Sequence, residues 1–429
     1  MKSGLNFLVA AKRCEITELQ QLAFTSALVN VSGRLVHGLQ RERGLSNLYL
    51  GSQGTRFAKA RAQQIDECRQ IEAELRACFD KLDTESDRVG HGARLFSRIA
   101  YVLHGLDALP ALRQQIDALR WTARQATDAY VRLIAGLLAV VFEAADSACD
   151  PEVSRLLVAL FNFMQGKEFA GQERAVGSAL FASGHAAAGE QQRLLHLIES
   201  QERCLQVFAE FSTAQVGALW AQSQDRAALA ELERMRRVLG TATAGAALDA
   251  SQSQVWFNCC SQRIDCMKVV EDQLAHDLLR VCEEKITAAS RDLQAYQALD
   301  ATTTREADPL SFFRDTPAPA GGQGAGSTPG AATPGFGVPA QSYGLQLERS
   351  ILELVQEQAR RLQTMGDELD TVRASLNERK LIDRAKGLLM QRQALSEQAA
   401  YDKLRKTAMD KGLKLVEVAQ LMLDAADLL

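Results

Sequence analysis

The distribution of proline constrains this chain of 429 residues more than any other feature. Only eight prolines occur, and six of them lie between Pro309 and Pro339, in a stretch filled mostly with Gly, Ala, Ser and Thr. Such a composition buries too little apolar surface to offset chain entropy, so it predicts a flexible linker. The other two prolines, Pro110 and Pro151, leave the preceding residues almost free of helix breakers.

Apolar residues before the linker recur at intervals of three and four, as in a run of α-helices. One example is the group Leu156, Leu157, Leu160, Phe161 and Met164. Alternation with a period of two is nowhere sustained, which argues against β-strands. The pattern predicts an all-α chain whose N-terminal part packs as helical bundles.

The proline-rich stretch divides the chain into regions. We expect a helical domain over 1–305, a linker over 306–343, a coiled-coil stem over 344–376 and a small helical module over 377–429. The whole composition, with 47% hydrophobic and 24% charged residues, is typical of globular proteins.

Several classes of protein are excluded because their characteristic sequence motifs are missing. The longest nearly apolar run, Leu133–Phe142, is about half of what a membrane-spanning helix needs. The nine cysteines include no Cys-x-x-Cys pair, and no two histidines have the spacing of metal ligands. Phosphate-loop, dinucleotide-binding, zinc-protease and serine-hydrolase motifs are missing. We therefore expect a soluble, cytoplasmic protein with reduced thiols, no metal, no cofactor and no enzymatic activity.

A short internal repeat organises the N-terminal domain. The segment LQRERGLSNLYLGS (39–52) and the segment AGQERAVGSALFASG (170–184) share Glu-Arg, a small residue, Ser and an aromatic residue in the same order. Arg43 of the first corresponds to Arg174 of the second. Duplication of one four-helix bundle would explain this spacing, so we expect a pair of bundles.

Arg43 interrupts an apolar stripe of its predicted helix. Val29, Val36, Arg43 and Leu50 are spaced by sevens and therefore fall along one line of the helix. A buried guanidinium requires an anionic or hydrogen-bonding partner. Either Arg43 and Arg174 face each other and clamp a small planar anion, or each pairs with a carboxylate, for example Glu42 with Arg174 and Glu173 with Arg43. Ser46 and Ser178 are plausible supporting donors for an anion, each one turn beyond its arginine.

A heptad pattern predicts the stem. Val355, Leu362, Leu369 and Leu376 follow one another by sevens, with further apolar residues interleaved between them. About four heptads are enough for the seam of a parallel homodimer. The alternative is an amphipathic helix that docks on the N-terminal domain.

The main feature of the C-terminal module, before any comparison with known families, is a basic patch. Residues 376–415 carry ten basic and five acidic side chains, a net charge of +5 on a chain whose total charge is −4. Such a patch suits a polyanion such as RNA, although a solvated helix surface would look similar. The candidate RNA-binding residues are Lys380, Arg384, Lys386, Arg405 and Lys406, with Tyr401 as a candidate for stacking on a base.

The C-terminal residues resemble a known family along the whole module. The runs KLIDRAKGLLM (380–390), SEQAAYDKLR (396–405), Ala408-Met409 and LVEVA (415–419) are similar to the ANTAR domain. The resemblance implies a coiled-coil stem and a three-helix module that binds RNA hairpins and prevents termination of transcription.

The N-terminal domain resembles the NIT domain through LQRERG (39–44) and GQERA (171–175). That resemblance implies an all-helical receptor for nitrate or nitrite, with the anion held by Arg43 and Arg174. Together, the two resemblances imply a one-component antiterminator that responds to nitrate or nitrite, binds hairpins in leader mRNA, forms a homodimer and has no membrane partner. The alternative is a helical anion sensor whose coiled-coil tail binds a protein instead of RNA.

Overall fold

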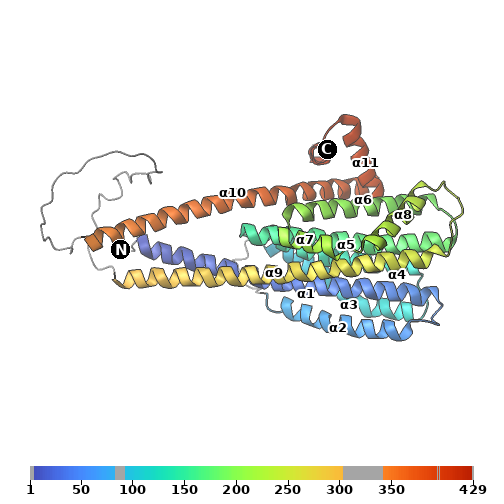
Figure 1. The fold of residues 1–429 in the computed structure, drawn as a ribbon, viewed down its shortest axis with the longest axis horizontal. Coiled ribbons are helices and arrows are strands. Elements are labelled where there is room, and N and C mark those ends of the chain that lie inside the picture. The colour runs from blue at the N-terminus through green and yellow to red at the C-terminus, as the bar shows by residue number, and fades with distance from the viewer. Residues whose placement is uncertain (1–3, 83–91, 303–341, 394, 396, 428–429) are drawn as a thin grey trace. The chain divides into compact units, whose positions relative to one another are not determined.

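The computed structural model describes residues 4–82, 92–302, 342–393, 395 and 397–427. These residues form helices and no β-strand, so the predicted all-α class is confirmed. The N-terminal helices are α1 (Gly4–Gly51), α2 (Ala58–Phe79), α3 (Gly92–Asp117), α4 (Ala123–Ser147), α5 (Pro151–Ser183), α6 (Ala188–Phe211), α7 (Ala214–Ser223), α8 (Arg226–Thr241) and α9 (Gln252–Thr302) (Figure 1). The C-terminal helices are α10 (Ser342–Gln393), α11 (Glu397–Lys411) and α12 (Leu415–Asp427).

The chain divides into two compact units, and α1, α9 and α10 each contribute to both. The smaller unit lies within residues 1–18 and 285–368. In it, the ammonium of Lys12 lies 2.7 Å from a carboxylate oxygen of Glu15 and 3.0 Å from one of Asp292. Arg361 of α10 reaches Glu15 at 3.0 Å. Ion pairs between parts of three helices therefore hold this unit together.

The larger unit lies within residues 19–284 and 369–429 and contains both bundles and the C-terminal module. The boundary predicted between stem and module, at 376–377, falls inside α10, which is continuous through it. Nearly all of the linker predicted at 306–343 lies outside the described residues.

Local sequence sets where several helices begin and end. Thr122 and Gln125 form a capping box at the start of α4, each side chain accepting the other's backbone N–H. Asp150 caps α5 by accepting the N–H of Val153, and Pro151 occupies the first turn, where no backbone donor is needed. Gly184 ends α5 at φ 72°, a left-handed conformation that glycine adopts without strain.

A buried glutamate joins the four helices of the first bundle. Glu42 of α1 accepts two hydrogen bonds of 2.8 Å from Arg113 of α3, one of 2.7 Å from Tyr130 of α4 and one from the Cys68 thiol of α2. Burial alone would raise the pKa of Glu42, but the hydrogen bond from Arg113 and the other donors hold it below its ordinary value.

The second bundle repeats this arrangement. Glu173 of α5 accepts two hydrogen bonds of 2.6 Å from Arg236 of α8 and one of 2.9 Å from Gln201 of α6. Trp256 of α9 is fully buried and donates its indole N–H to the backbone carbonyl of Arg174 at 3.1 Å. The equivalent roles of Glu42 and Glu173 agree with the duplication inferred from the sequence repeat.

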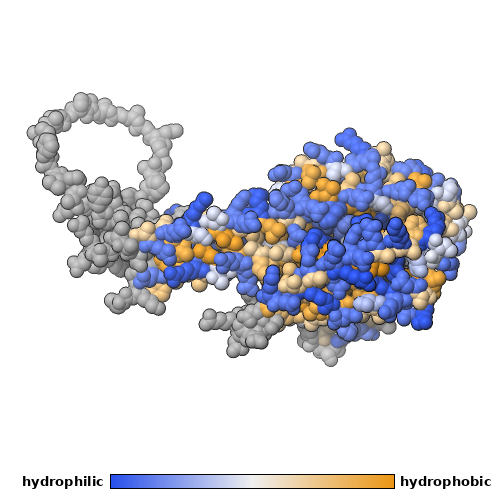
Figure 2. Space-filling view, turned by 90° about the horizontal axis from the view of Figure 1, so that it is seen from below, coloured by the Kyte–Doolittle hydropathy of each residue, from blue (hydrophilic) through white to orange (hydrophobic). Residues whose placement is uncertain are grey.

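The central helix of the N-terminal domain is α5, because nearly every residue from Val153 to Met164 is buried. The apolar stripe predicted on α1 is also confirmed: Val29, Val36 and Leu50 belong to the largest buried cluster, and Arg43 is 3% exposed. No described helix is both long and apolar enough to cross a membrane. On the face that Figure 2 shows, hydrophilic side chains (blue) surround smaller apolar areas (orange).

The buried pair Glu42–Arg113 should contribute strongly to stability. Glu42→Gln leaves the guanidinium of Arg113 without a countercharge in the core, so we expect the free energy of unfolding to fall by about 3 kcal/mol. Urea denaturation followed by circular dichroism measures this. Asp66→Asn, which breaks the exposed pair between Asp66 and Arg69, should cost less than about 1 kcal/mol. Equal losses in the free energy of unfolding for the two variants would contradict the expectation that the buried pair contributes more than the exposed one.

Candidate functional site

The two arginines singled out by the sequence meet where α1 and α5 approach each other closely. The Nη2 of Arg43 lies 2.8 Å from the position that a Cβ of Gly171 on α5 would occupy. Reciprocally, the Nη2 of Arg174 lies 3.3 Å from the corresponding position at Gly44 on α1. Each guanidinium therefore lies over a glycine of the opposite helix, in space that a larger residue would fill.

Arg43 is paired with a carboxylate that the sequence reasoning did not identify. Its Nη1 lies 2.5 Å from Glu168 Oε1 and its Nη2 lies 3.2 Å from Oε2. The same carboxylate accepts hydrogen bonds from Gln40 at 2.8 Å and Gln172 at 2.9 Å. A signal was available: Lys167 and Glu168 stand within an otherwise mostly apolar helix.

The specific alternative pairing considered for the sequence is wrong. Glu42 bonds Arg113 and not Arg174, while Glu173 bonds Arg236 and not Arg43. Glu42 and Glu173 each point into their own bundle. Adjacent positions of a helix face directions about 100° apart, so the arginine that follows each glutamate points to the α1–α5 seam instead.

Arg174 has no carboxylate partner among the described residues. It donates a hydrogen bond of 2.9 Å to the Ser261 hydroxyl of α9, and its guanidinium lies 4.8 Å from the ring centre of Phe257. Burial, and then the nearby charge of Arg43, lower the pKa of Arg174. Its cationic form is therefore incompletely compensated, which is the condition in which a bound anion is most favourable.

The two serines proposed as supporting donors have different surroundings. Ser46 is buried in the first bundle, where it accepts a hydrogen bond of 3.0 Å from Arg61 and lies 3.5 Å from the hydroxyl of Tyr130. The Ser178 hydroxyl is buried and has no hydrogen-bond partner within the described part of the chain. Of the two, only Ser178 has a donor that is not already used.

Two of the five predicted RNA-binding residues are paired with acidic residues of the N-terminal helices. Lys380 of α10 forms an ion pair with Asp146 of α4. Arg405 of α11 lies 2.6 Å from a carboxylate oxygen of Glu199 of α6. Both cations therefore already form ion pairs with carboxylates of their own chain.

The other three candidates remain within the module or at its surface. Lys386 bonds Asp383 at 2.7 Å and Glu397 at 2.9 Å. Arg384 and Lys406 are exposed. The structure thus does not gather all five on one free face.

Tyr401, the candidate for base stacking, is 7% exposed and lies against α6. The guanidinium of Arg203 lies 4.3 Å from the centre of its ring, and the His196 ring lies 5.4 Å away. A hydrogen bond of 3.2 Å from Gln192 to Asp402 adds to this contact. The module therefore docks on α6 through a ring, a cation and polar groups.

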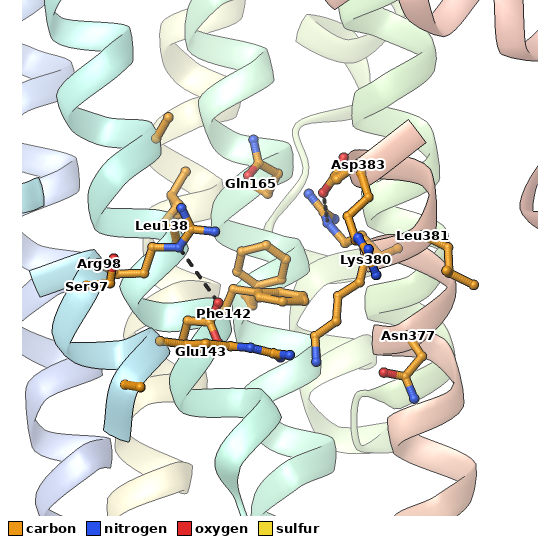
Figure 3. A pocket seen from close by; sticks show the side chains of 17 residues that line it. Ser97, Arg98, Leu138, Phe142, Glu143, Gln165, Asn377, Lys380, Leu381 and Asp383 are labelled. Carbon is orange, nitrogen blue, oxygen red and sulfur yellow. Dashed lines mark ion pairs between the residues drawn. The ribbon is translucent and has the colours of Figure 1, made fainter. Parts of the chain in front are cut away.

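Beside the docked module there is a groove of about 1240 Å³ between helices of the N-terminal domain and α10 (Figure 3). Arg98, Phe142 and Glu143 line one side, while Asn377 and Lys380 line the other. Cations from both sides face it, and Arg98 and Lys380 are paired there with Glu143 and Asp146.

The residues of the predicted dimer seam differ in exposure. Leu362 is 57% exposed, whereas Leu369 and Leu376 are buried at 9% and 2%. Leu376 belongs to the same buried cluster as the core of the N-terminal helices. The side chain of Val355 lies outside the described residues. The seam itself stays a prediction.

Comparison with known proteins identifies two families. Residues 34–279 match the NIT family, described as nitrate and nitrite sensing, and residues 370–423 match the ANTAR domain. The chain is 32% identical over 423 residues to a nitrate regulatory protein of Klebsiella oxytoca, covering 98% of this chain and 94% of that protein. It is also similar to a solved structure of the NasR transcription antiterminator, with 30% identity, a TM-score of 0.58 and 99% of each chain covered.

The two arginines should differ in their effect on stability. Arg174→Met removes a charge that lacks a carboxylate partner, so we expect the free energy of unfolding to rise by about 1 kcal/mol or more. Arg43→Met leaves Glu168 buried without its countercharge and should lower it by about 3 kcal/mol. Urea denaturation in a buffer whose only anion is a bulky sulfonate tests both variants. A loss of stability in Arg174→Met would mean that Arg174 is already compensated.

Proposed function

This chain belongs to the NIT family of nitrate- and nitrite-sensing proteins and carries an ANTAR domain, and from that premise we propose that it is a one-component transcription antiterminator controlled by nitrate or nitrite. It acts by binding alone, in the cytoplasm where leader mRNA is made, with no catalytic step. Anion binding in the helical sensor frees the C-terminal module to bind hairpins in leader mRNA and prevent termination, which would control genes of nitrate assimilation.

The observation that carries this proposal is the reciprocal placement of Arg43 and Arg174 over Gly171 and Gly44. Nitrate is a planar monoanion with three equivalent oxygens, and guanidinium is a planar, permanently charged group with donors in one plane. The two guanidiniums repel each other without an anion, and an anion held by both replaces that repulsion by attraction. Ligand binding therefore favours one arrangement of α1 against α5.

Packing offers a route from this seam to the module. Val372 and Leu376 of α10 belong to the same buried cluster as Val36 of α1 and Leu157 of α5. Packed cores do not deform continuously, so a change in how α1 meets α5 alters the surface on which α10 rests. The route does not require force to pass along the linker, which a slack tether could not transmit.

In the anion-free state, the docking contacts keep the module from RNA. Lys380 and Arg405 are held by Asp146 and Glu199, and Tyr401 is covered by α6. The side chains of Arg405 and Glu199 are both more than 40% exposed, so this pair contributes at most about 1 kcal/mol. Weak contacts of this kind suit a switch, because a modest differential affinity of the ligand is enough to release them.

We also propose that the chain forms a homodimer through the N-terminal part of the predicted seam, at Val355 and Leu362, because Leu369 and Leu376 are buried within their own chain. The 57% exposure of Leu362 supports an apolar position there that is free to contact a second copy. Two modules in one dimer would engage two neighbouring hairpins, and the second contact would gain from its high effective concentration.

The anion site should depend on guanidinium geometry as well as on charge. Arg43→Lys keeps the charge but loses the planar fork, so nitrate binding should weaken at least about tenfold. Gly171→Ala places a methyl group against the Arg43 guanidinium and should weaken binding similarly while leaving the fold intact. Isothermal titration calorimetry on the full chain measures both.

Gly189→Ala on α6 is the matched control, because nothing lies within 4 Å of the added Cβ. It should bind nitrate as the unmodified chain does. Normal nitrate binding by Arg43→Lys would show that the clamp geometry is wrong.

Removing the acidic docking residues should release the module. We expect Asp146→Asn with Glu199→Gln to raise the affinity for a two-hairpin leader RNA about threefold to tenfold without nitrate, and to leave it unchanged with saturating nitrate. A series of gel-shift titrations at several salt concentrations measures this. Glu202→Gln with Glu210→Gln removes the same charge from exposed positions of α6 and should change little. No RNA binding by any variant at any salt concentration would favour a protein partner for the tail.

A further inference from the structure

Glu168 is the carboxylate nearest the two arginines and is unusually well held. It is 2% exposed and accepts four hydrogen bonds, two from Arg43, one from Gln40 of α1 and one from Gln172 of α5. Both of its oxygens accept from N–H donors, and two of these bonds come from the cationic guanidinium of Arg43. As the ion-pair partner of Arg43, Glu168 contributes one negative charge to the seam.

The charges that surround the two arginines can be counted. Arg43 and Arg174 contribute two positive charges, and Glu168 contributes one negative charge. The Cys260 thiol is neutral, since burial raises its pKa well above the ordinary value. His37 is neutral as well, because burial, and then the charge of Lys167, lower its pKa to about 3. The seam carries a net charge of +1.

The other ionisable groups nearby fall into balanced sets. Arg236 and Arg263 lie close to Glu173 and Glu233. Lys167 and Lys268 are paired with Glu271 and Asp272, which balance them. Asp265 of α9 acts on Arg174 but is exposed, so solvent screens its charge. The excess charge thus belongs to the cluster of Arg43, Arg174 and Glu168.

A buried cluster is most stable when its net charge is zero, because an uncompensated charge loses its hydration. One monoanion brings this cluster to zero, whereas a dianion leaves it at −1. We propose that Glu168 determines specificity at the proposed nitrate site, by setting a charge that admits a monoanion and excludes a dianion of similar size. This inference rests on the proposed function, since it assigns Glu168 a role toward the same ligand.

A merely structural role for Glu168 would predict something different. If Glu168 only positioned Arg43, its loss would weaken the binding of all anions by the same factor. If Glu168 sets the charge of the site, its loss changes the ratio between the affinities for a monoanion and for a dianion. The ratio therefore separates the two roles, whatever happens to absolute affinity.

The test compares nitrate with sulfite on the full chain by isothermal titration calorimetry at about pH 8.5. Sulfite is then a dianion with three oxygens, and the nine cysteines are free thiols, so it has no disulfide to attack. In Glu168→Gln, which keeps the shape of the side chain, we expect the preference for nitrate over sulfite to fall at least about tenfold. Gln172→Lys adds one positive charge at the same place without removing Glu168, and should shift the ratio in the same direction.

Two controls keep the outcomes distinct. Glu168→Asp keeps the charge and should keep the ratio even if both affinities fall. Glu42→Gln removes a buried carboxylate one position from Arg43 and should lower stability without changing the ratio. An unchanged ratio in both Glu168→Gln and Gln172→Lys, or an equal fall in Glu168→Asp, would overturn the inference. Failure of the unmodified chain to bind nitrate would instead count against the proposed function.

Discussion

The close approach of α1 and α5 is the constraint on which the rest of the sensor depends. Gly171 and Gly44 leave room at the crossing, and a guanidinium from the opposite helix lies over each. The cost is two like charges at the seam, on the buried Arg43 and the half-buried Arg174, of which Glu168 compensates only one. A seam arranged in this way is less stable than an apolar seam of the same shape. A bound anion can restore the lost stability, because it compensates the excess positive charge.

The two bundles make this deficit tolerable. Glu42 and Glu173 are saturated by donors from their own bundles, so each bundle has a satisfied polar centre of its own. Repulsion between the two arginines therefore does not unfold either bundle. It changes how α1 of the first bundle packs against α5 of the second, and a sensor can use such a change in packing.

The module is attached to this scaffold by contacts of two kinds. Val372 and Leu376 are buried in the largest core cluster, which fixes this part of α10. The contacts of Arg405 and Tyr401 with α6 are polar and partly exposed. The strong contacts locate the module and the weak ones can be exchanged, so release does not require the fold to come apart.

The sequence by itself determined the helical class and singled out the two arginines at the seam, because helical periodicity fixes which residues share a face. It also placed the basic residues of the module, since charge is a property of composition. Only the tertiary structure decided that Arg43 meets Glu168, that Glu42 and Glu173 turn to Arg113 and Arg236, and that Lys380 and Arg405 face acids of the sensor. The physical reason is that periodicity gives the direction of a side chain around its own helix, whereas its partner depends on which distant helix packs against that face.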